Sequence, residues 1–176
     1  MIFASVGSST IPFDRFLRAL DNVDTGEDLV VQRGASTLRP RRAQVLDYLG
    51  YNDFVALIRA SRVVVTHAGA GSVITALGEG KQPIVVPRRV AQREAVDDHQ
   101  VAFARRAADL GLVTLVEDVS LLEAALRDHE PSEARRSTEP SPIERELRVY
   151  IEHCVGPAKV ESAGAGGGEI TAAPRS

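Results

Sequence analysis

Residues 63–72 read Val63-Val64-Val65-Thr66-His67-Ala68-Gly69-Ala70-Gly71-Ser72. Three consecutive valines are typical of a strand that is covered on both faces, as in a parallel sheet. Two glycines follow, and residues 71–80 then favour a short helix that Gly80 can end. The segment therefore predicts a strand, a tight turn and a helix, in the order of a βαβ unit.

Comparable units stand on both sides of this segment. Short apolar runs predict further strands at 2–6, 28–32, 44–49, 83–87 and 112–116. Helical periodicity predicts helices at 12–23, 53–60, 97–110 and 120–127. Ser120, with Glu123 three residues later, predicts a capping box for the last of them. Strands alternating with helices predict an α/β, Rossmann-like parallel sheet.

The predicted order fades after this domain, which we place at residues 1–128. A polar, proline-rich stretch at 129–142 indicates a linker, and 143–155 is predicted as a C-terminal helix. Residues 156–176 are rich in glycine and small residues and are predicted to be disordered.

Length and composition exclude several classes of protein. The 176 residues suffice for one domain, and we expect no second domain with a cleft between the two. A net charge of −3 offers no basic field for nucleic acid. The single cysteine, Cys154, excludes an internal disulfide and a thiolate zinc cluster, and no metal site is expected. No apolar run has the length of a membrane span and the start lacks a signal peptide, so a cytoplasmic location is expected.

Two loops at predicted strand ends could hold phosphate. In the loop at 66–72, glycines allow close backbone approach, and the following helix directs free N–H groups to the same place. Ser72 could add a hydroxyl or cap the helix. The first loop, Gly7 to Thr10, combines one glycine with three hydroxyls. For each loop the alternative is a tight turn that binds nothing, and taken alone the first loop favours that alternative.

The start of the helix at 97–110 carries Asp97, Asp98, His99 and Gln100. The aspartates are explained as caps. Gln100 offers the donor and acceptor that sugar hydroxyls need, and His99 is either a base, a donor or a structural residue. Before them, three arginines follow the fifth strand. These are Arg88, Arg89 and Arg93. They could bind phosphates of a lipid-linked acceptor or an anionic membrane, or they could belong to a solvated loop that binds nothing.

The combination of motifs resembles the C-terminal domain of glycosyltransferase family 28. The resemblance rests on the stretch at 63–72, on Ala76-Leu77, Gly80-Lys81, Pro83 to Pro87 and Asp98-His99-Gln100, and on Val6 to Ser9 and Gly50 to Phe54. Within the family the chain is most similar to stand-alone C-terminal halves. These are the PssE-type subunit of bacterial two-chain exopolysaccharide transferases and the cytosolic subunit of the eukaryotic dolichol-linked N-acetylglucosamine transferase.

The resemblance implies the C-terminal half of a GT-B fold, which binds a UDP-sugar as substrate without a cofactor. By matching positions, Gly7 and Ser8 would lie near the diphosphate, and the backbone of Leu49, Gly50 and Tyr51 would read the uracil edge. The phosphates would be bound by Gly69, Ala70, Gly71 and Ser72, and the donor sugar would be faced by His99 and Gln100. Ser9, His67 and Asp98 are further substrate-binding candidates. Many members carry Glu where this chain has Thr75, which leaves the nucleotide less certain.

The expected function is the donor-binding, catalytic subunit of a two-chain inverting glycosyltransferase that acts on a lipid-diphosphate-linked saccharide. A membrane-anchored partner would supply the acceptor site and the general base, and would hold this chain at the inner face of the membrane. The alternative is a non-catalytic sugar-nucleotide-binding or activating partner of a separate transferase. A redox Rossmann protein is disfavoured, because no Gly-x-Gly-x-x-Gly follows the first strand.

Overall fold

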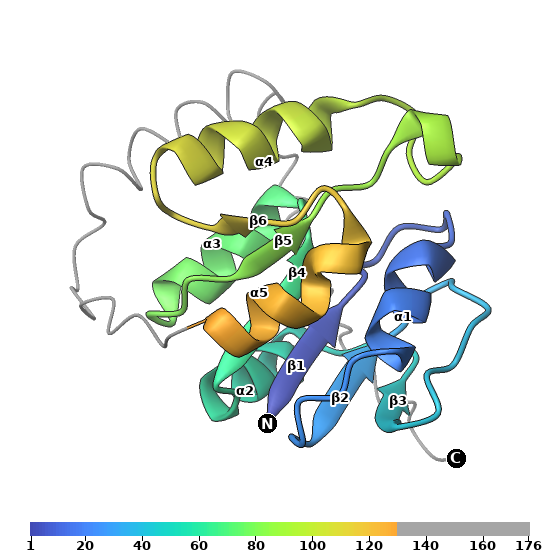
Figure 1. Ribbon diagram of the computed structural model, residues 1–176, viewed down its shortest axis with the longest axis vertical. Helices are drawn as coiled ribbons and strands as arrows, with labels where there is room; N and C mark the ends of the chain where they lie inside the picture. Colours follow the sequence, from blue (N-terminus) through green and yellow to red (C-terminus); the bar gives the residue numbers. More distant parts are fainter. Residues whose placement is uncertain (130–176) are drawn as a thin grey trace, which may run out of the picture.

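The computed structural model describes residues 1–129, which form a six-stranded parallel sheet (Figure 1). The strand order is β3-β2-β1-β4-β5-β6. The strands are β1 (Ile2–Ser5), β2 (Leu29–Gln32), β3 (Ala43–Leu46), β4 (Val63–His67), β5 (Ile84–Val86) and β6 (Thr114–Leu115). All five pairings are parallel, which confirms the predicted sheet. The predictions for 130–176, which include the C-terminal helix and the tail, lie outside the described residues.

Five α-helices and two 3-10 turns connect and follow the strands. The helices are α1 (Asp14–Asp21), α2 (Tyr51–Ala60), α3 (Ala70–Gly78), α4 (His99–Asp109) and α5 (Leu122–Asp128), and the 3-10 turns are η1 (Val90–Gln92) and η2 (Val119–Leu121). In Figure 1, α1 and α5 cover one face of the sheet and α2, α3 and α4 the other. The connection from β2 to β3 contains no helix.

Alternating residues of the central strand explain this two-sided packing. Ile2 and Ala4 belong to the apolar cluster that also contains residues of α1 and α5. Phe3, between them, packs with Ile58 of α2 and Ala76 of α3. Because successive strand residues point to opposite faces, one short run of apolar residues builds both layers of the core. The valines of β4 do the same beside it.

The end of α3 is as predicted, but the start of α5 differs. Gly80 has a φ of +71° and its N–H donates to the Leu77 carbonyl, as a helix stop requires. The predicted capping box at Ser120 is wrong. Asp118 caps instead, accepting from the Ser120 N–H at 2.9 Å, and Ser120 lies inside η2. Because the carboxylate of Asp118 accepts from the Ser120 N–H, a 3-10 turn forms before the α-helix.

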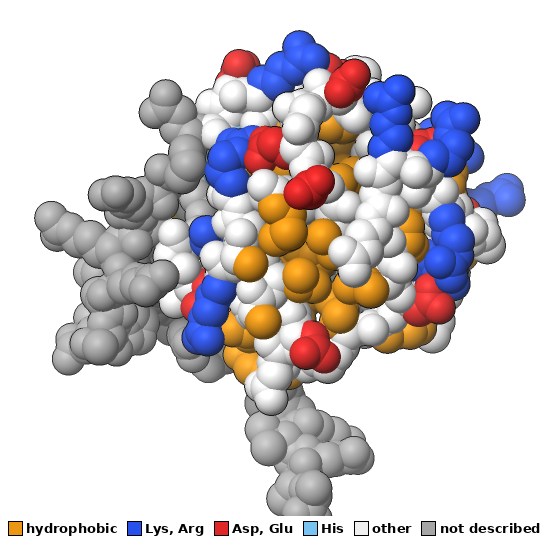
Figure 2. Space-filling model, turned by 90° about the horizontal axis from the view of Figure 1, so that it is seen from below, with side chains coloured by type: hydrophobic (Ala, Val, Ile, Leu, Met, Phe, Trp, Pro, Cys, Tyr) orange, Lys and Arg blue, Asp and Glu red, His pale blue; other side chains and the backbone are white. Residues whose placement is uncertain are grey.

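The surface at the end of the molecule where the N-terminus lies is seen in Figure 2. Apolar side chains gather near its centre, and acidic and basic side chains surround them without a field of one sign. No helix within residues 1–129 has both the length and the apolar character needed to cross a membrane. In the same residues no group of three His, Cys, Asp or Glu side chains is placed to hold a metal ion.

Candidate functional site

The carboxyl ends of the strands carry a pocket of about 280 Å³. Parallel register aligns Ser5 of β1 with Gln32 of β2, so the ends of these strands meet at one edge. Small residues of the β1–α1 loop and the start of α3 line part of the pocket, and aromatic residues around the start of α2 line the rest. The lining comprises Ser5, Gly7, Ser8, Gln32, Tyr48, Leu49, Tyr51, Phe54 and Ser72.

Gln32 shapes this pocket and was not predicted from the sequence. Its Oε1 accepts from the Gly7 N–H at 3.2 Å, and its Nε2 donates to the Gly7 carbonyl at 3.0 Å. Oε1 also accepts from the Ser5 hydroxyl at 2.6 Å, and Nε2 donates to the Asp47 carbonyl at 3.3 Å. Gly7 has a φ of +80°, which a residue with a side chain rarely adopts. The buried amide therefore holds a glycine loop in a conformation that only glycine takes readily.

His67 joins the two glycine loops. A Cβ atom on Gly7 would lie 1.9 Å from His67 Nε2, and one on Gly69 would lie 1.8 Å from His67 Cε1. The imidazole thus occupies the space that side chains at both glycines would need. Its Nδ1 is buried and has no hydrogen-bond partner in the described part of the chain. An unpartnered buried nitrogen is uncommon in folded proteins.

The charge state of His67 follows from its surroundings. Burial, together with the positive charge of Arg88, lowers the pKa of His67 from 6.5 to about 3. The imidazole is therefore neutral at physiological pH, with one nitrogen that donates and one that accepts. The ring between the two glycine loops is therefore uncharged and able to form hydrogen bonds.

The N-terminus of α3 faces the same edge. Gly69 occupies its N-cap position without a side-chain cap hydrogen bond, so Ser72 does not cap the helix. The first N–H groups of a helix lack partners within it, and together they favour an anion. Ser72 lines the pocket and Gly71 is exposed, with nothing within 4 Å of a Cβ placed on it. Thr75 lies one turn further and donates its hydroxyl to the Gly71 carbonyl at 2.8 Å.

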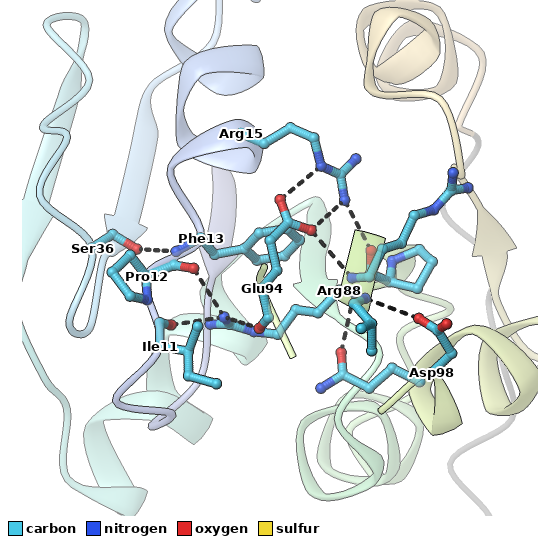
Figure 3. A network of polar contacts seen from close by, with 12 residues as sticks. Ile11, Pro12, Phe13, Arg15, Ser36, Arg88, Glu94 and Asp98 are labelled. Carbon is cyan, nitrogen blue, oxygen red and sulfur yellow. Dashed lines mark hydrogen bonds and ion pairs between the residues drawn. The ribbon is translucent and has the colours of Figure 1, made fainter. Parts of the chain in front are cut away.

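For Arg88, one of the three arginines after β5, both interpretations made from the sequence are wrong. It is only 2% exposed, so it is neither a solvated residue nor free to meet an outside phosphate. Figure 3 shows its guanidinium reaching the carbonyls of Ile11 and Pro12, and a further bond goes to Val6. Arg89 pairs with Glu117, and Arg93 is exposed on the loop.

The start of α4 does not line this pocket. Gln100 Oε1 accepts from the Arg88 N–H at 3.3 Å, and Asp98 accepts from the Val90 N–H at 3.0 Å. Asp98 occupies the N-cap position of α4 but makes no side-chain cap hydrogen bond, so the predicted cap at Asp98 is wrong, because its carboxylate is engaged by Val90. The Asp97 carboxylate accepts from the His99 N–H at 3.1 Å instead. These contacts hold the loop between β5 and α4, and the side chains that were predicted to face the donor sugar are engaged in it.

The predicted site residues therefore fall into three groups. Those that line the pocket are Gly7, Ser8, Leu49, Tyr51 and Ser72. Those beside it in the chain, on the same loops or on α3, are Ser9, Gly50, His67, Gly69, Ala70, Gly71 and Thr75. Those on the neighbouring β5–α4 connection are Asp98, His99 and Gln100. The lining residues missed are Ser5, Gln32, Tyr48 and Phe54, which become visible only once the register is known.

Comparison with protein families identifies the domain. The model of the glycosyltransferase family 28 C-terminal domain matches residues 1–152. The chain belongs to this family. Among curated proteins no sequence matches it.

Solved structures agree on the fold of this family 28 domain. A glycosyltransferase of kitacinnamycin superposes with a TM-score of 0.55 at 22% identity, covering 85% of this chain and 39% of that one. MurG of Acinetobacter baumannii gives 0.51 at 18% identity, with 84% and 48% covered. The calicheamicin glycosyltransferase CalG4 gives 0.51 at 20%, with 84% and 37% covered. The family 28 domain thus spans less than half the length of each of these glycosyltransferases.

Proposed function

We propose that this family 28 domain binds the UDP-sugar donor of an inverting glycosyltransferase and acts as its catalytic donor subunit. The observation that carries the proposal is the composition of the pocket. Aromatic side chains line one part, and glycines, hydroxyls and a helix N-terminus border another. A nucleoside diphosphate has the matching parts, since its base is flat and its diphosphate is anionic.

The described residues suggest a role for each part of the pocket. Tyr48 and Tyr51 are exposed by 58% and 71% and would contact the uracil. The backbone of Gly7, the hydroxyl of Ser72 and the N-terminus of α3 would hold the diphosphate. During transfer the bond from the anomeric carbon to the diphosphate oxygen breaks, and negative charge develops on the departing UDP. Fixed N–H donors stabilise such charge, and no metal is invoked for it.

The acceptor hydroxyl forms the new bond from the opposite face of the sugar, with inversion. We place the base that takes its proton on a second chain. Large exposed apolar side chains lie in the segments that follow the carboxyl ends of two strands: Tyr48 and Tyr51 after β3, and Val90 and Val96 after β5. A membrane-anchored, acceptor-binding partner at these strand ends would deliver a lipid-diphosphate-linked saccharide, and would place this chain at the inner face of a membrane.

A second candidate function is that of a non-catalytic partner, which binds sugar nucleotide and activates a separate transferase. The observation that favours it is the engagement of Gln100, whose Oε1 already accepts from the Arg88 N–H. His99, beside it, is held near Asp97 rather than in the pocket. In that case the donor sugar would be handled by the other chain.

Two measurements test the proposal. Calorimetry of the isolated chain with UDP, UDP-glucose, UDP-glucuronate and UDP-N-acetylglucosamine should show binding and rank the donors. Turnover is then measured for the chain reconstituted with the product of the adjacent reading frame. Gln100→Ala should lower turnover, while Gln92→Ala, an exposed glutamine of η1, should not. Full turnover of Gln100→Ala, with UDP-sugar binding only to the other chain, would establish the activating role instead.

A further inference from the structure

One buried arginine joins the two loops that border the site. Arg88 Nη2 donates to the Val6 carbonyl at 2.9 Å, directly before Gly7. Its Nη1 donates to the Ile11 carbonyl at 2.8 Å and the Pro12 carbonyl at 3.3 Å, further along the β1–α1 loop. Nη1 also donates to the Glu94 carbonyl at 3.1 Å, within the β5–α4 connection (Figure 3). A single guanidinium therefore connects segments that are about eighty residues apart.

The charge of this arginine is not cancelled by an ion pair. Glu94 directs its carboxylate to Arg15 Nε at 2.8 Å, to Arg15 Nη2 at 2.9 Å and to the Arg89 N–H at 3.2 Å. Within residues 1–129 no carboxylate forms an ion pair with Arg88. Its guanidinium instead lies 4.6 Å from the centre of the Phe13 ring and is surrounded by carbonyl oxygens. Burial lowers the pKa of Arg88, and the charge of Glu94 opposes this lowering. Dipoles and a π-face thus solvate a buried cation whose nearest carboxylate is bonded to other groups.

The positive charge of Arg88 affects His67, which lies between the two glycine loops. Arg88 is one of the two causes of the lowered pKa of His67, the ring between Gly7 and Gly69. Its backbone N–H also donates to Gln100 Oε1 at the start of α4. The residue is therefore in contact with the β1–α1 loop, its own loop and α4, and its field reaches the glycine loops.

We propose that Arg88 is a positioning residue of the donor site, which fixes the β1–α1 loop against the β5–α4 connection and supplies buried positive charge next to a bound diphosphate. The part that concerns the diphosphate rests on the proposed function. The part that concerns the loops depends only on the contacts above. Arginine suits both parts because its planar fork serves several acceptors at once and stays charged when buried.

Two substitutions at Arg88 separate the effect of its hydrogen-bond geometry from the effect of its positive charge. Arg88→Lys keeps the charge but cannot reproduce four bonds in fixed directions. Arg88→Met keeps similar length and loses both properties. Arg18→Met, at an exposed arginine of α1, is the control for a change of net charge alone.

The experiment measures amide hydrogen exchange at residues 7–13 in the free chains and the affinity for UDP and for uridine by calorimetry. Exchange at 7–13 should quicken in both Arg88 variants and stay unchanged in Arg18→Met. Arg88→Met should weaken UDP binding about tenfold while uridine binding changes less than about twofold, because only UDP carries the charge. Arg88→Lys should lose less UDP affinity than Arg88→Met.

Each outcome bears on a separate part. If the wild-type chain binds no UDP, the proposed function fails, and the exchange data still decide the loop-fixing role. If the wild type binds UDP and Arg88→Met binds it within about twofold of Arg18→Met, the electrostatic part is overturned. Unchanged exchange at 7–13 in Arg88→Lys overturns the loop-fixing part, and this variant remains informative if Arg88→Met does not fold.

Discussion

The side-chain amide of Gln32 forms hydrogen bonds with both the N–H and the carbonyl of Gly7. The backbone pairing of β1 and β2 ends with the Val6 N–H, which donates to the Gln32 carbonyl, and the Gln32 side chain then binds Gly7, two residues beyond β1. The loop at the site is thus tied to the last residue of β2.

Replacing Gln32 with leucine should therefore affect both stability and binding. Leucine removes the donor to the Gly7 carbonyl, while the Gly7 N–H keeps Ser5 Oγ and the Asp47 carbonyl keeps the Gly34 N–H. The loss should cost about 1–3 kcal/mol of unfolding free energy in urea. UDP affinity should fall as well, because the Gly7 carbonyl is no longer held. Gln44→Leu, at an exposed position of the edge strand β3, should change stability by no more than about 0.5 kcal/mol. Equal losses of stability and of UDP affinity in Gln32→Leu and Gln44→Leu would contradict the role of Gln32 in holding Gly7.

Alanine at Gly69 and at Gly71 should have different effects. At Gly69 the new methyl meets His67 Cε1, so the folded chain should lose roughly 1–3 kcal/mol of stability. At Gly71 nothing lies within 4 Å, so the chain should stay as stable as wild type or gain about 0.5 kcal/mol. Gly71→Ala should nevertheless bind UDP more weakly in calorimetry, because its methyl would point at the phosphates. If Gly71→Ala binds UDP with wild-type affinity, the diphosphate does not lie at the N-terminus of α3.

His67 should make stability depend on pH below neutrality. Its pKa in the folded chain is lowered from 6.5 to about 3, chiefly by burial. The stability that the neutral ring contributes is complete above pH 6.5 and is lost as the pH falls from there towards 3. The slope from this one group is at most about 1.4 kcal/mol per pH unit. Urea unfolding of wild type and His67→Gln at pH 7, 6 and 5 should show a difference that shrinks with acid, and a constant difference would count against burial of the ring.

Glu27 provides a test of stability that is remote from the site. Its hydrogen bonds with Arg62 and with the N-terminal ammonium lower its pKa from 4.5 to about 2. The ion pair therefore stabilises the chain fully above pH 4.5, and this contribution is lost as the pH falls to about 2. Glu27→Gln should cost about 1–2 kcal/mol at pH 7, allowing for partial exposure, and almost nothing near pH 2. UDP affinity should be unchanged, since Glu27 precedes β2 at the opposite edge of the sheet.

The sheet could be predicted from the sequence because its information is local. Runs such as Val63 to Val65 and Pro83 to Pro87 are typical of covered strands, and the helices between them show a clear period. The alternation predicts parallel pairing, whereas the strand order was not predicted and is given by the structure. The start of α5 was missed because Asp118 and Glu123 could each accept from the Ser120 N–H, and that hydrogen bond goes to Asp118.

The candidate site could be predicted only at its backbone features. Gly7, Ser8 and Ser72 belong to loops whose glycines and strand ends are visible in the sequence. Gln32 and Arg88 were not assigned their roles, because those roles depend on which residues the fold brings beside them. A buried glutamine and a buried arginine look like surface residues until their carbonyl and N–H partners, 25 and about 80 residues away, are known.

The imidazole of His67 fills the space that side chains at Gly7 and Gly69 would need, so the three positions are coupled through packing. A methyl at Gly69 is excluded only while the imidazole is present, whereas Gly7 is also restricted by its φ of +80°. The effects of substitutions at 67 and 69 should therefore be epistatic: Gly69→Ala should be better tolerated in a His67→Ala background than in the wild type. In natural variants of this domain, a smaller residue at position 67 would allow position 69 to change, while position 7 would remain glycine.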